Sequence, residues 1–388
     1  MTAVEGSPAP RTTGDPDPSA TAVRAAVVRE KGGPFVFEAL TLDTRLRPDE
    51  VLVRVVATGV CQTDIHVRDQ YLPTPLPAVL GHEGAGVVER VGGAVTTVAP
   101  GDRVVMSYQA CGHCAPCRSG NPAYCALSFP LNFGGARLDR SNALSAPGGE
   151  EIHGHFFGQS SFATHSLATE RNVVKVGDEV PLELLAPLGC GIQTGAGAVL
   201  NSLRVEAGAS VVVIGTGTVG LAAVMAAKVA GASPVIAVDI VAERLDLARE
   251  LGATHTVNAR DEDTAARIGE ITGGGADYVL EITARPEMLT LAVDALAPLG
   301  TAALIGGAPA GAHAPVNMNA LLGGRSLRGI AQGDSIPQLF IPQLIELYRS
   351  GRFPFDRLIT PYGFDRINEA VDDTRSGTVI KPVLRIGS

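Results

Sequence analysis

The chain has 388 residues, of which 45% are hydrophobic and 18% are charged. This length and apolar content suffice for two domains, each with its own buried core. The net charge of −9 and the lack of a basic cluster argue against nucleic acid and an anionic membrane surface as partners. No apolar stretch approaches the roughly 20 residues that a membrane-spanning helix needs. We therefore expect neither a nucleic acid nor a membrane as a partner.

Residues 1–21 are rich in Pro, Ser, Thr, Ala and Gly and lack the apolar core of a signal peptide. We expect a disordered leader there. Without a secretory signal, the six cysteines should stay in a reducing, cytoplasmic environment.

The first part of the chain is predicted to hold many short strands separated by glycine turns, as in a small barrel-like domain. Residues rich in Val and other β-branched side chains indicate the strands. Two stretches without a clear period, 60–78 with its alternating prolines and 131–157, are expected to be irregular. The expected strands lie in residues 22–29, 50–56, 79–93, 101–105 and 162–176, with helices at 182–186 and 189–200.

After residue 210 the pattern alternates between short apolar runs and helical stretches. Residues 211–214 are a continuous apolar run, which is typical of a strand buried on both faces. The alternation predicts an α/β fold with a doubly wound parallel sheet. The expected strands are 211–214, 235–238, 254–258, 277–282, 301–305 and 327–330, and the expected helices are 221–230, 243–251, 288–297 and 341–350. We expect the extended tail, 379–386, to return to the first domain.

One loop, residues 111–125, holds four cysteines and is called the four-cysteine loop below. Four thiolates in so short a loop can bind one tetrahedral Zn²⁺ with no open position, as in a structural site. Two disulfides, or thiols that bind nothing, are the alternatives. The spacing favours zinc, because C-x2-C pairs in a reducing compartment are typical of metal sites. The four residues are Cys111, Cys114, Cys117 and Cys125.

A glycine motif, GTGTVG, directly follows the apolar run and opens a helix. Gly215 suits a tight turn, Gly217 lets a pyrophosphate approach the backbone, and Gly220 allows close helix–sheet packing. An acid at the end of the next strand, Asp239, would bind the free hydroxyls of an adenosine ribose, which favours NAD over NADP. A glycine turn without a ligand is the alternative. The predicted site comprises Gly215, Gly217, Thr218, Val219, Gly220 and Asp239, with Arg244 flanking the adenosine or exposed on its helix.

Three further residues lie far apart in the sequence but share a chemistry. Cys61, His82 and Cys190 supply two thiolates and an imidazole, enough for a three-ligand zinc site with one open position. Taken singly, His82 is more often a core histidine and Cys190 an inert buried thiol. Together, beside a dinucleotide motif, they predict a catalytic metal.

The chain resembles the zinc-dependent medium-chain alcohol dehydrogenases from about Val23 to its end. The resemblance rests on GHE, the four-cysteine loop, GCG and GTGTVG. It implies a β-rich GroES-like catalytic domain over 22–191 and 333–388, and a Rossmann NAD-binding domain over 192–332. Within the family the chain looks most like the aryl-alcohol (benzyl alcohol) dehydrogenases. That closer match is carried by GHEGAGVVERVG (81–92), FFGQSSFA (156–163), LGCGIQTGAG (188–197) and KPVLRIG (381–387).

The resemblance implies a role for each matching residue around the metal. Cys61, His82 and Cys190 would hold the catalytic zinc, which favours alkoxide over alcohol near neutral pH. Glu83 would lie behind the zinc and exchange with its ligands. Asp64 would bind His82 and fix its tautomer. Two zinc ions per chain and one NAD are therefore expected, and the reaction would be alcohol + NAD⁺ ⇌ aldehyde + NADH + H⁺.

The resemblance also implies residues that move the proton and hold the coenzyme. Thr63 would take the alcohol proton, and His66 would pass it to solvent, although a surface histidine is the alternative. Thr194, Val219 and Lys381 match positions around the nicotinamide and the pyrophosphate. Gln62 departs from the charged residue of several relatives. Relatives are dimers or tetramers joined at the nucleotide-domain sheet edge, so we expect a homodimer or homotetramer.

Five of the 11 phenylalanines fall between residues 129 and 162 and could form an apolar slot for a flat ring or an allylic chain. By family position the pocket residues are Leu72, Phe156 and Phe157, while Phe162 is expected in the core. A rival is a glutathione- or mycothiol-type formaldehyde dehydrogenase, but Leu72 and Phe129 replace the charged pair that holds the peptide. A zinc-free, quinone-reductase-like binder is disfavoured, because that branch lacks the metal ligands.

Overall fold

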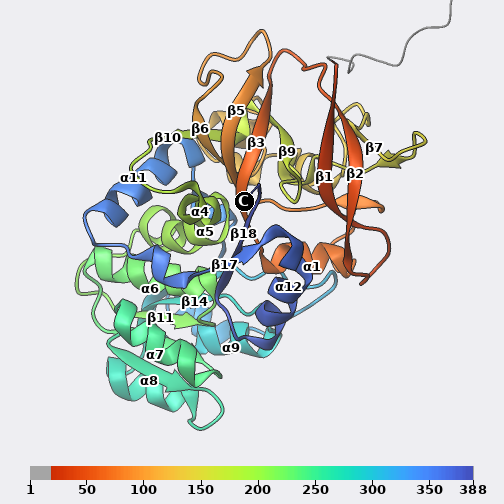
Figure 1. Ribbon diagram of the computed structural model, residues 1–388. Helices are drawn as coiled ribbons and strands as arrows, with labels where there is room; N and C mark the ends of the chain where they lie inside the picture. The colour runs from red at the N-terminus through yellow and green to blue at the C-terminus, as the bar shows by residue number, and fades with distance from the viewer. Residues whose placement is uncertain (1–18, 388) are drawn as a thin grey trace, which may run out of the picture.

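The structure, a computed structural model, describes residues 19–387. Three sheets organise this part of the chain, two in a β-rich region and one in an α/β region (Figure 1). The predicted combination of a β-rich domain and a doubly wound parallel sheet is confirmed.

The β-rich region consists of a five-stranded and a seven-stranded sheet. The first has the order β4-β1-β2-β7-β8, and the second has the order β10-β6-β5-β3-β18-β17, with β9 also paired to β3. The strands are β1 (Ala20–Val28), β2 (Phe35–Asp43), β3 (Glu50–Gly59), β4 (Ala78–Val79), β5 (Gly84–Val91), β6 (Arg103–Met106), β7 (Leu144–Ser145), β8 (Glu151–Ile152), β9 (His165–Thr169), β10 (Val173–Val176), β17 (Ile359–Gly363) and β18 (Lys381–Arg385).

The α/β region is built on a six-stranded sheet whose neighbouring strands are all parallel, in the order β13-β12-β11-β14-β15-β16. This order reverses direction at β11, which is the switch point where such sheets bind ligands. The strands are β11 (Val211–Ile214), β12 (Val235–Asp239), β13 (His255–Asn258), β14 (Ala276–Glu281), β15 (Leu296–Leu304) and β16 (Ser326–Gly329).

Helices cover both faces of this parallel sheet. Side chains alternate along β11, so Val211 and Val213 pack into one core while Val212 and Ile214 pack into another. The first core includes side chains of α5, α6 and α7, and the second includes side chains of α8 and α9. The helices are α1 (Gln62–Arg68), α2 (Ala115–Arg118), α3 (Ser128–Phe133), α4 (Leu182–Leu185), α5 (Gly191–Gly197), α6 (Thr218–Ala230), α7 (Ala242–Leu251), α8 (Thr264–Thr272), α9 (Pro286–Asp294), α10 (Met318–Leu322), α11 (Pro337–Arg349) and α12 (Ile367–Ser376).

The end of the chain returns to the β-rich region, as predicted for the tail. β18 pairs antiparallel with β3, and Val383 lies opposite Gly59. In Figure 1 the blue β18 lies beside the orange β3, close to the C-terminus. This pairing brings Lys381 next to the loop that follows β3, where the predicted metal ligand Cys61 lies.

Several elements differ from the sequence-based expectations. Residues 60–78 are not irregular throughout, because α1 begins directly after Cys61. The stretch 131–157 contains the end of α3 and the short strands β7 and β8. Four longer elements were not predicted, because their apolar residues are sparse or interrupted by charged and polar residues: β2, α8, β17 and α12.

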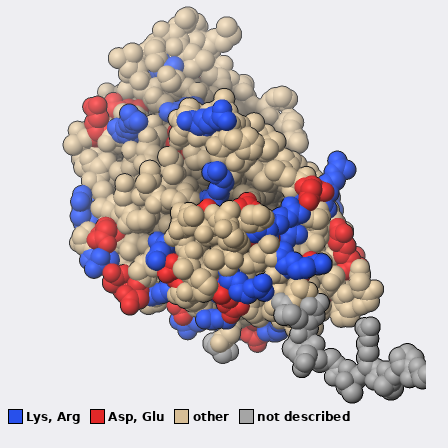
Figure 2. Space-filling model, turned by 90° about the horizontal axis from the view of Figure 1, so that it is seen from above, with Lys and Arg blue, Asp and Glu red and all other residues tan. Residues whose placement is uncertain are grey.

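The disordered leader predicted for residues 1–21 lies mostly outside the described residues. At its end the prediction is wrong, because Ala20 and Thr21 already pair with Asp43 and Leu42 of β2. None of the helices in the described part of the chain is long and apolar enough to cross a membrane. Basic and acidic side chains are interspersed on the face shown in Figure 2, with no large basic area.

Candidate active site

Three segments bring four candidate metal ligands together. Cys61 follows β3 and precedes the first turn of α1, His82 and Glu83 precede β5, and Cys190 immediately precedes α5. One ligand atom of each residue lies within 4.8 Å of all the others. Residues up to 129 positions apart in the sequence thus meet at one point, and two thiols and an imidazole suit zinc.

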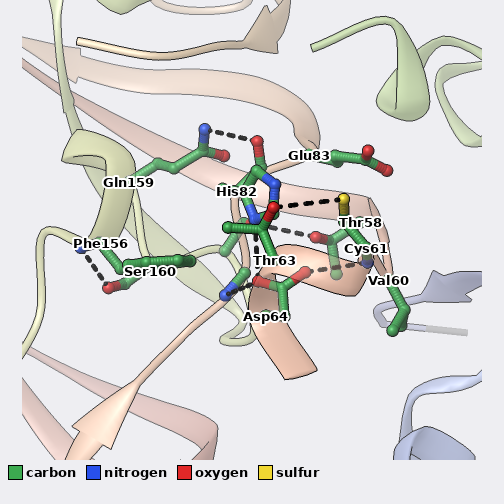
Figure 3. A network of polar contacts seen from close by, with 12 residues as sticks. Thr58, Val60, Cys61, Thr63, Asp64, His82, Glu83, Phe156, Gln159 and Ser160 are labelled. Atoms are coloured by element: carbon green, nitrogen blue, oxygen red, sulfur yellow. Dashed lines mark hydrogen bonds and ion pairs between the residues drawn. The ribbon is translucent and has the colours of Figure 1, made fainter. Parts of the chain in front are cut away.

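The imidazole of His82 is held so that only one ring nitrogen remains without a partner. Asp64 lies 2.9 Å from its Nδ1 atom and also accepts hydrogen bonds from the backbone N–H groups of Cys61 and Gly81 (Figure 3). The Nε2 atom of His82 is buried and has no hydrogen-bond partner. An orphaned buried nitrogen beside two thiols fits a metal ligand, because the ion would satisfy its lone pair.

Lys381 forms a buried ion pair with Glu83. The Nζ atom lies 2.9 and 3.0 Å from the two carboxylate oxygens and donates to the carbonyl of Val60 at 2.9 Å. Burial raises the pKa of Glu83, and the ammonium of Lys381 opposes that rise. The expected role of Lys381 near the coenzyme is thus only partly supported. Lys381 lines the cavity described below, but its charge is already paired with Glu83.

A strained turn supports the other side of His82. His155, Phe157, Gly158 and Ser160 all have φ between 50° and 62°. This conformation turns the ring of Phe157 onto His82, with ring centroids 4.5 Å apart. Non-glycine residues rarely adopt such φ values, and those that do often lie at functional sites.

Gln159 fixes this turn, and sequence reasoning did not identify it. Its Nε2 atom donates to the carbonyl of His82 (Figure 3) and to that of Ser107, and its Oε1 atom accepts from the backbone N–H of Gly84. The only sequence feature that could have identified Gln159 is its position in FFGQSSFA.

The prediction that Phe156 lines the pocket is wrong, because its ring is fully buried against His82 and Phe157 and is not part of the cavity wall.

The four-cysteine loop brings its sulfur atoms together as well. The Sγ atoms of Cys111, Cys114, Cys117 and Cys125 all lie within 4.8 Å of one another. All six cysteines of the chain are free thiols, so the two-disulfide alternative is excluded in this structure. A hydrogen bond from the backbone N–H of Ala126 lowers the pKa of Cys114 to about 6. A group of thiols that includes an easily ionised one suits a metal ion.

The glycine motif has the geometry expected of a phosphate-binding turn. Gly215 has φ +95°, and a Cβ atom on Gly220 would lie 1.9 Å from the carbonyl oxygen of Gly215. A Cβ atom on Gly217 would meet nothing within 4 Å, so the backbone there faces open space. The N-terminus of α6 follows, and its free N–H groups favour an anion.

Asp239 places an acidic group at the end of β12. Its carboxylate accepts hydrogen bonds from the backbone of Thr216, Ile240 and Val241 and from the Thr216 hydroxyl, at 2.7–3.1 Å. Asp239 does not itself line the cavity, whereas Arg244 does. The Nε atom of Arg244 is buried without a partner.

One cavity of about 660 Å³ is lined by Cys61 and Cys190 at one end and by residues of the glycine motif at the other. This volume lies within the usual range of small-molecule sites. Of the predicted residues, those that line the cavity are Cys61, Thr63, His66, Leu72, Phe157, Cys190, Thr194, Gly217, Thr218, Val219, Arg244 and Lys381. Phe133, one of the five phenylalanines considered for an apolar slot, also lines it, as do Tyr108, Asn132 and Gln332, which sequence reasoning did not identify. His82, Glu83, Gly215 and Gly220 are not part of its wall.

His66 lies at this cavity in a form suited to accept a proton. Burial lowers the pKa of His66, although Cys61 and Asp69 oppose the shift. The ring is therefore neutral at pH 7. Thr63, between Cys61 and His66 in α1, has its Oγ1 atom 3.9 Å from the Sγ atom of Cys61. A hydroxyl and a neutral imidazole thus lie near the thiols on one short helix.

Comparison with known proteins places this site in a family. Residues 47–178 match the alcohol dehydrogenase GroES-like domain, and residues 218–350 match the zinc-binding dehydrogenase domain. The chain is 48% identical over 364 residues to geraniol dehydrogenase of Castellaniella defragrans, covering 93% of this chain and 97% of that protein.

Two solved structures are also similar over nearly the whole chain. An alcohol dehydrogenase zinc-binding domain protein from Burkholderia ambifaria is 56% identical with a TM-score of 0.93, and benzyl alcohol dehydrogenase from Acinetobacter calcoaceticus is 50% identical with a TM-score of 0.92. Each comparison covers 95% of this chain and 100% of the other. The chain therefore belongs to the zinc-dependent medium-chain alcohol dehydrogenases, as its motifs predicted.

Proposed function

We propose that the protein oxidises primary alcohols with an aromatic ring or an allylic chain to the aldehyde, reversibly, with NAD as the hydride acceptor. The observation that carries this proposal is the shared cavity. Cys61 and Cys190 line it together with Gly217, whose backbone faces open space. A substrate at these thiols and a dinucleotide on the glycine turn would thus meet within one cavity.

Zinc, when bound by Cys61, His82 and Cys190, supplies a Lewis acid that favours ionisation of the alcohol. The chain's own residues then handle the proton. The Oγ1 atom of Thr63 accepts it from the alcohol, and the neutral imidazole of His66 carries it toward solvent. Because the pKa of His66 is lowered, the ring releases the proton readily at neutral pH.

The wall near the metal ligands supports an apolar substrate. Leu72, Phe133 and Phe157 line it, and the rings of Phe133 and Phe157 lie edge to face with centroids 5.1 Å apart. A flat ring or an allylic chain would pack against these faces, whereas ethanol would leave them in contact with water. The names of two relatives, geraniol dehydrogenase and benzyl alcohol dehydrogenase, point to the same alcohols.

A substrate panel tests this proposal. We expect kcat/KM for benzyl alcohol and geraniol to exceed that for ethanol by at least about 100-fold, because each buried methylene contributes about 0.8 kcal/mol. Phe133→Ala should reduce this preference, whereas Phe364→Ala, a change of a ring that does not line the cavity, is the matched control. Equal values for ethanol and benzyl alcohol would refute the substrate class, and a strict need for an added thiol would favour the formaldehyde dehydrogenase alternative.

The choice of NAD over NADP is supported by the fixed charge of Asp239. A 2′-phosphate on the adenosine ribose would be repelled by the negative charge of Asp239 at the end of β12, whereas free hydroxyls carry no charge to repel. We expect kcat/KM to be higher with NAD⁺, and Asp239→Gly to reduce that preference. Better turnover with NADP⁺ in the unaltered enzyme would refute this assignment.

We also propose two zinc ions per chain and association through β16. The catalytic site would hold one ion and the four-cysteine loop the other.

β16 forms an edge of the parallel sheet, and all four of its residues are exposed. A second copy could extend the sheet there to give a dimer or tetramer. Light scattering should detect an assembly that Leu327→Pro disrupts, because proline removes a backbone donor from the edge.

A further inference from the structure

Tyr124 connects the four-cysteine loop to the wall of the coenzyme cavity. It immediately precedes Cys125. Its hydroxyl donates to the Oδ1 atom of Asp334 at 2.5 Å and accepts from the backbone N–H of Ala331 at 3.3 Å. These partners are more than 200 residues away, in the segment 330–334 that follows β16 and is called the wall segment here.

The wall segment has an unfavourable backbone. Gln332, Gly333 and Asp334 have φ values of 51°, 64° and 51°. Such a run persists in non-glycine residues only where surrounding contacts hold it. Asp334 accepts from Tyr124 and from Arg328, whose Nη2 atom lies 2.5 Å from Oδ2.

Two further contacts hold the wall segment and the residue after it. The hydroxyl of Tyr108 donates to the carbonyl of Ser335, which directly follows the segment, at 2.6 Å. Gly333 packs against α5, where an added Cβ atom would lie 2.6 Å from the carbonyl oxygen of Gln193. Cys190 directly precedes α5. The same helix therefore contacts the wall segment and carries a candidate metal ligand at its start.

The wall segment carries an unused hydrogen-bonding group beside the cavity. Ile330, Ala331 and Gln332 line it, and the Oε1 atom of Gln332 is buried without a partner. A buried acceptor is costly unless a ligand supplies a donor. Since Asp239 marks the adenosine end over β12, the segment after β16, at the opposite edge of the sheet, lies toward the nicotinamide half of the coenzyme.

We propose that Tyr124 is a positioning residue for coenzyme binding: its hydrogen bonds hold the strained wall segment so that Gln332 faces the nicotinamide half of NAD(H). The four-cysteine loop thereby acts on the coenzyme site as well as on stability. This inference rests on the proposed use of NAD.

Equilibrium binding of NADH to the metal-loaded enzyme, followed by fluorescence, tests the proposal without turnover. Tyr124→Phe should raise the Kd by roughly tenfold, the usual effect of one hydrogen bond to a charged group. Asp334→Ala breaks the same contact from the other side and should raise the Kd at least as much. The matched control is Tyr362→Phe, which removes another tyrosine–aspartate hydrogen bond of 2.5 Å, to Asp373, outside the cavity wall. Its Kd should stay within about twofold of the unaltered enzyme.

A double-mutant cycle tests whether Tyr124 affects NADH binding through Gln332. If Tyr124 acts through Gln332, the Kd of the Tyr124→Phe/Gln332→Leu double variant should lie within about twofold of that of Gln332→Leu alone. Additive effects would overturn this route. A Tyr124→Phe enzyme that binds NADH as tightly as the unaltered enzyme would overturn the positioning role alone. An unaltered enzyme that binds no NADH would overturn the proposed function as well.

Discussion

Lys381 and Glu83 are joined by two contacts of 2.9 and 3.0 Å although they are 298 residues apart, and both side chains are almost completely buried. A buried charge that loses its partner is strongly destabilising. Lys381→Met should therefore lower the free energy of unfolding by about 3–5 kcal/mol, as measured by denaturant titration.

A second variant distinguishes pairing from coenzyme binding. The double variant Glu83→Gln/Lys381→Met should recover part of the lost stability, because it leaves no charge unpaired. If Lys381 instead serves mainly the pyrophosphate, Lys381→Met would leave stability unchanged and weaken NADH binding.

The sequence predicted residues that belong to motifs, but not contacts that depend on the tertiary fold. The four-cysteine loop and the glycine motif could be predicted from their spacing, whereas Cys61, His82 and Cys190 were grouped by their shared chemistry and by the family motifs around them. The pairing of Lys381 with Glu83 could not be predicted, because it depends on β18 lying beside β3. The different positions of the adjacent residues Phe156 and Phe157 could not be predicted either. Phe157 has a left-handed backbone conformation, and only Phe157 lines the cavity.

The elements missed from the sequence have a similar physical reason. In α12 only Ile367, Ala370 and Val371 are buried, so its apolar stripe is short. β2 alternates irregularly between exposed and buried residues. Such segments are ordered by the partners they pack against, which a local pattern does not contain.

Gly217 and Gly220 belong to one motif but should respond differently to alanine. A Cβ atom on Gly217 would enter open cavity space, so Gly217→Ala should leave the melting temperature within about 2 °C and raise the Kd for NADH at least about tenfold. A Cβ atom on Gly220 would overlap the carbonyl oxygen of Gly215. Gly220→Ala should therefore lower the melting temperature, as seen by calorimetry. Equal stability losses would contradict a ligand-facing role for Gly217.

His66 should control the rate of alcohol oxidation without affecting the metal. His66→Ala is expected to lower kcat/KM at pH 7 by about 100-fold, toward the low end of the contribution of a proton-transfer group. Because burial lowers the pKa of His66, the unaltered enzyme should lose this contribution only below the histidine's usual titration range, as the ring becomes protonated. Pre-steady-state rates across pH would measure it. His255→Ala, at an exposed histidine, is the control, and an unchanged rate in His66→Ala would remove the residue from the relay.

The two proposed metal sites can be separated by single substitutions. Cys114→Ser and Cys190→Ser should each reduce the zinc content measured by mass spectrometry from two to one per chain. Only Cys190→Ser should abolish turnover while the fold is kept, because it removes a ligand beside the cavity. Cys114→Ser should lower the melting temperature by about 6–12 °C if the four-cysteine site contributes about 3 kcal/mol. Loss of both ions in either variant would contradict independent sites.

His155 should make the protein sensitive to acid. Desolvation, aided by the charges of Arg137 and Arg47, lowers the pKa of the half-buried His155 to about 3. In the unfolded chain the same group titrates near 6.5, so below that pH the unfolded state binds more protons than the folded state. The free energy of unfolding should therefore fall as the pH drops from about 6.5 toward 3, by up to about 1.4 kcal/mol per pH unit. His155→Asn removes the titrating group and tolerates its φ of 59°. Denaturant titrations at pH 6 and pH 5 should show a smaller loss for this variant, and equal losses would assign the acid sensitivity to other groups.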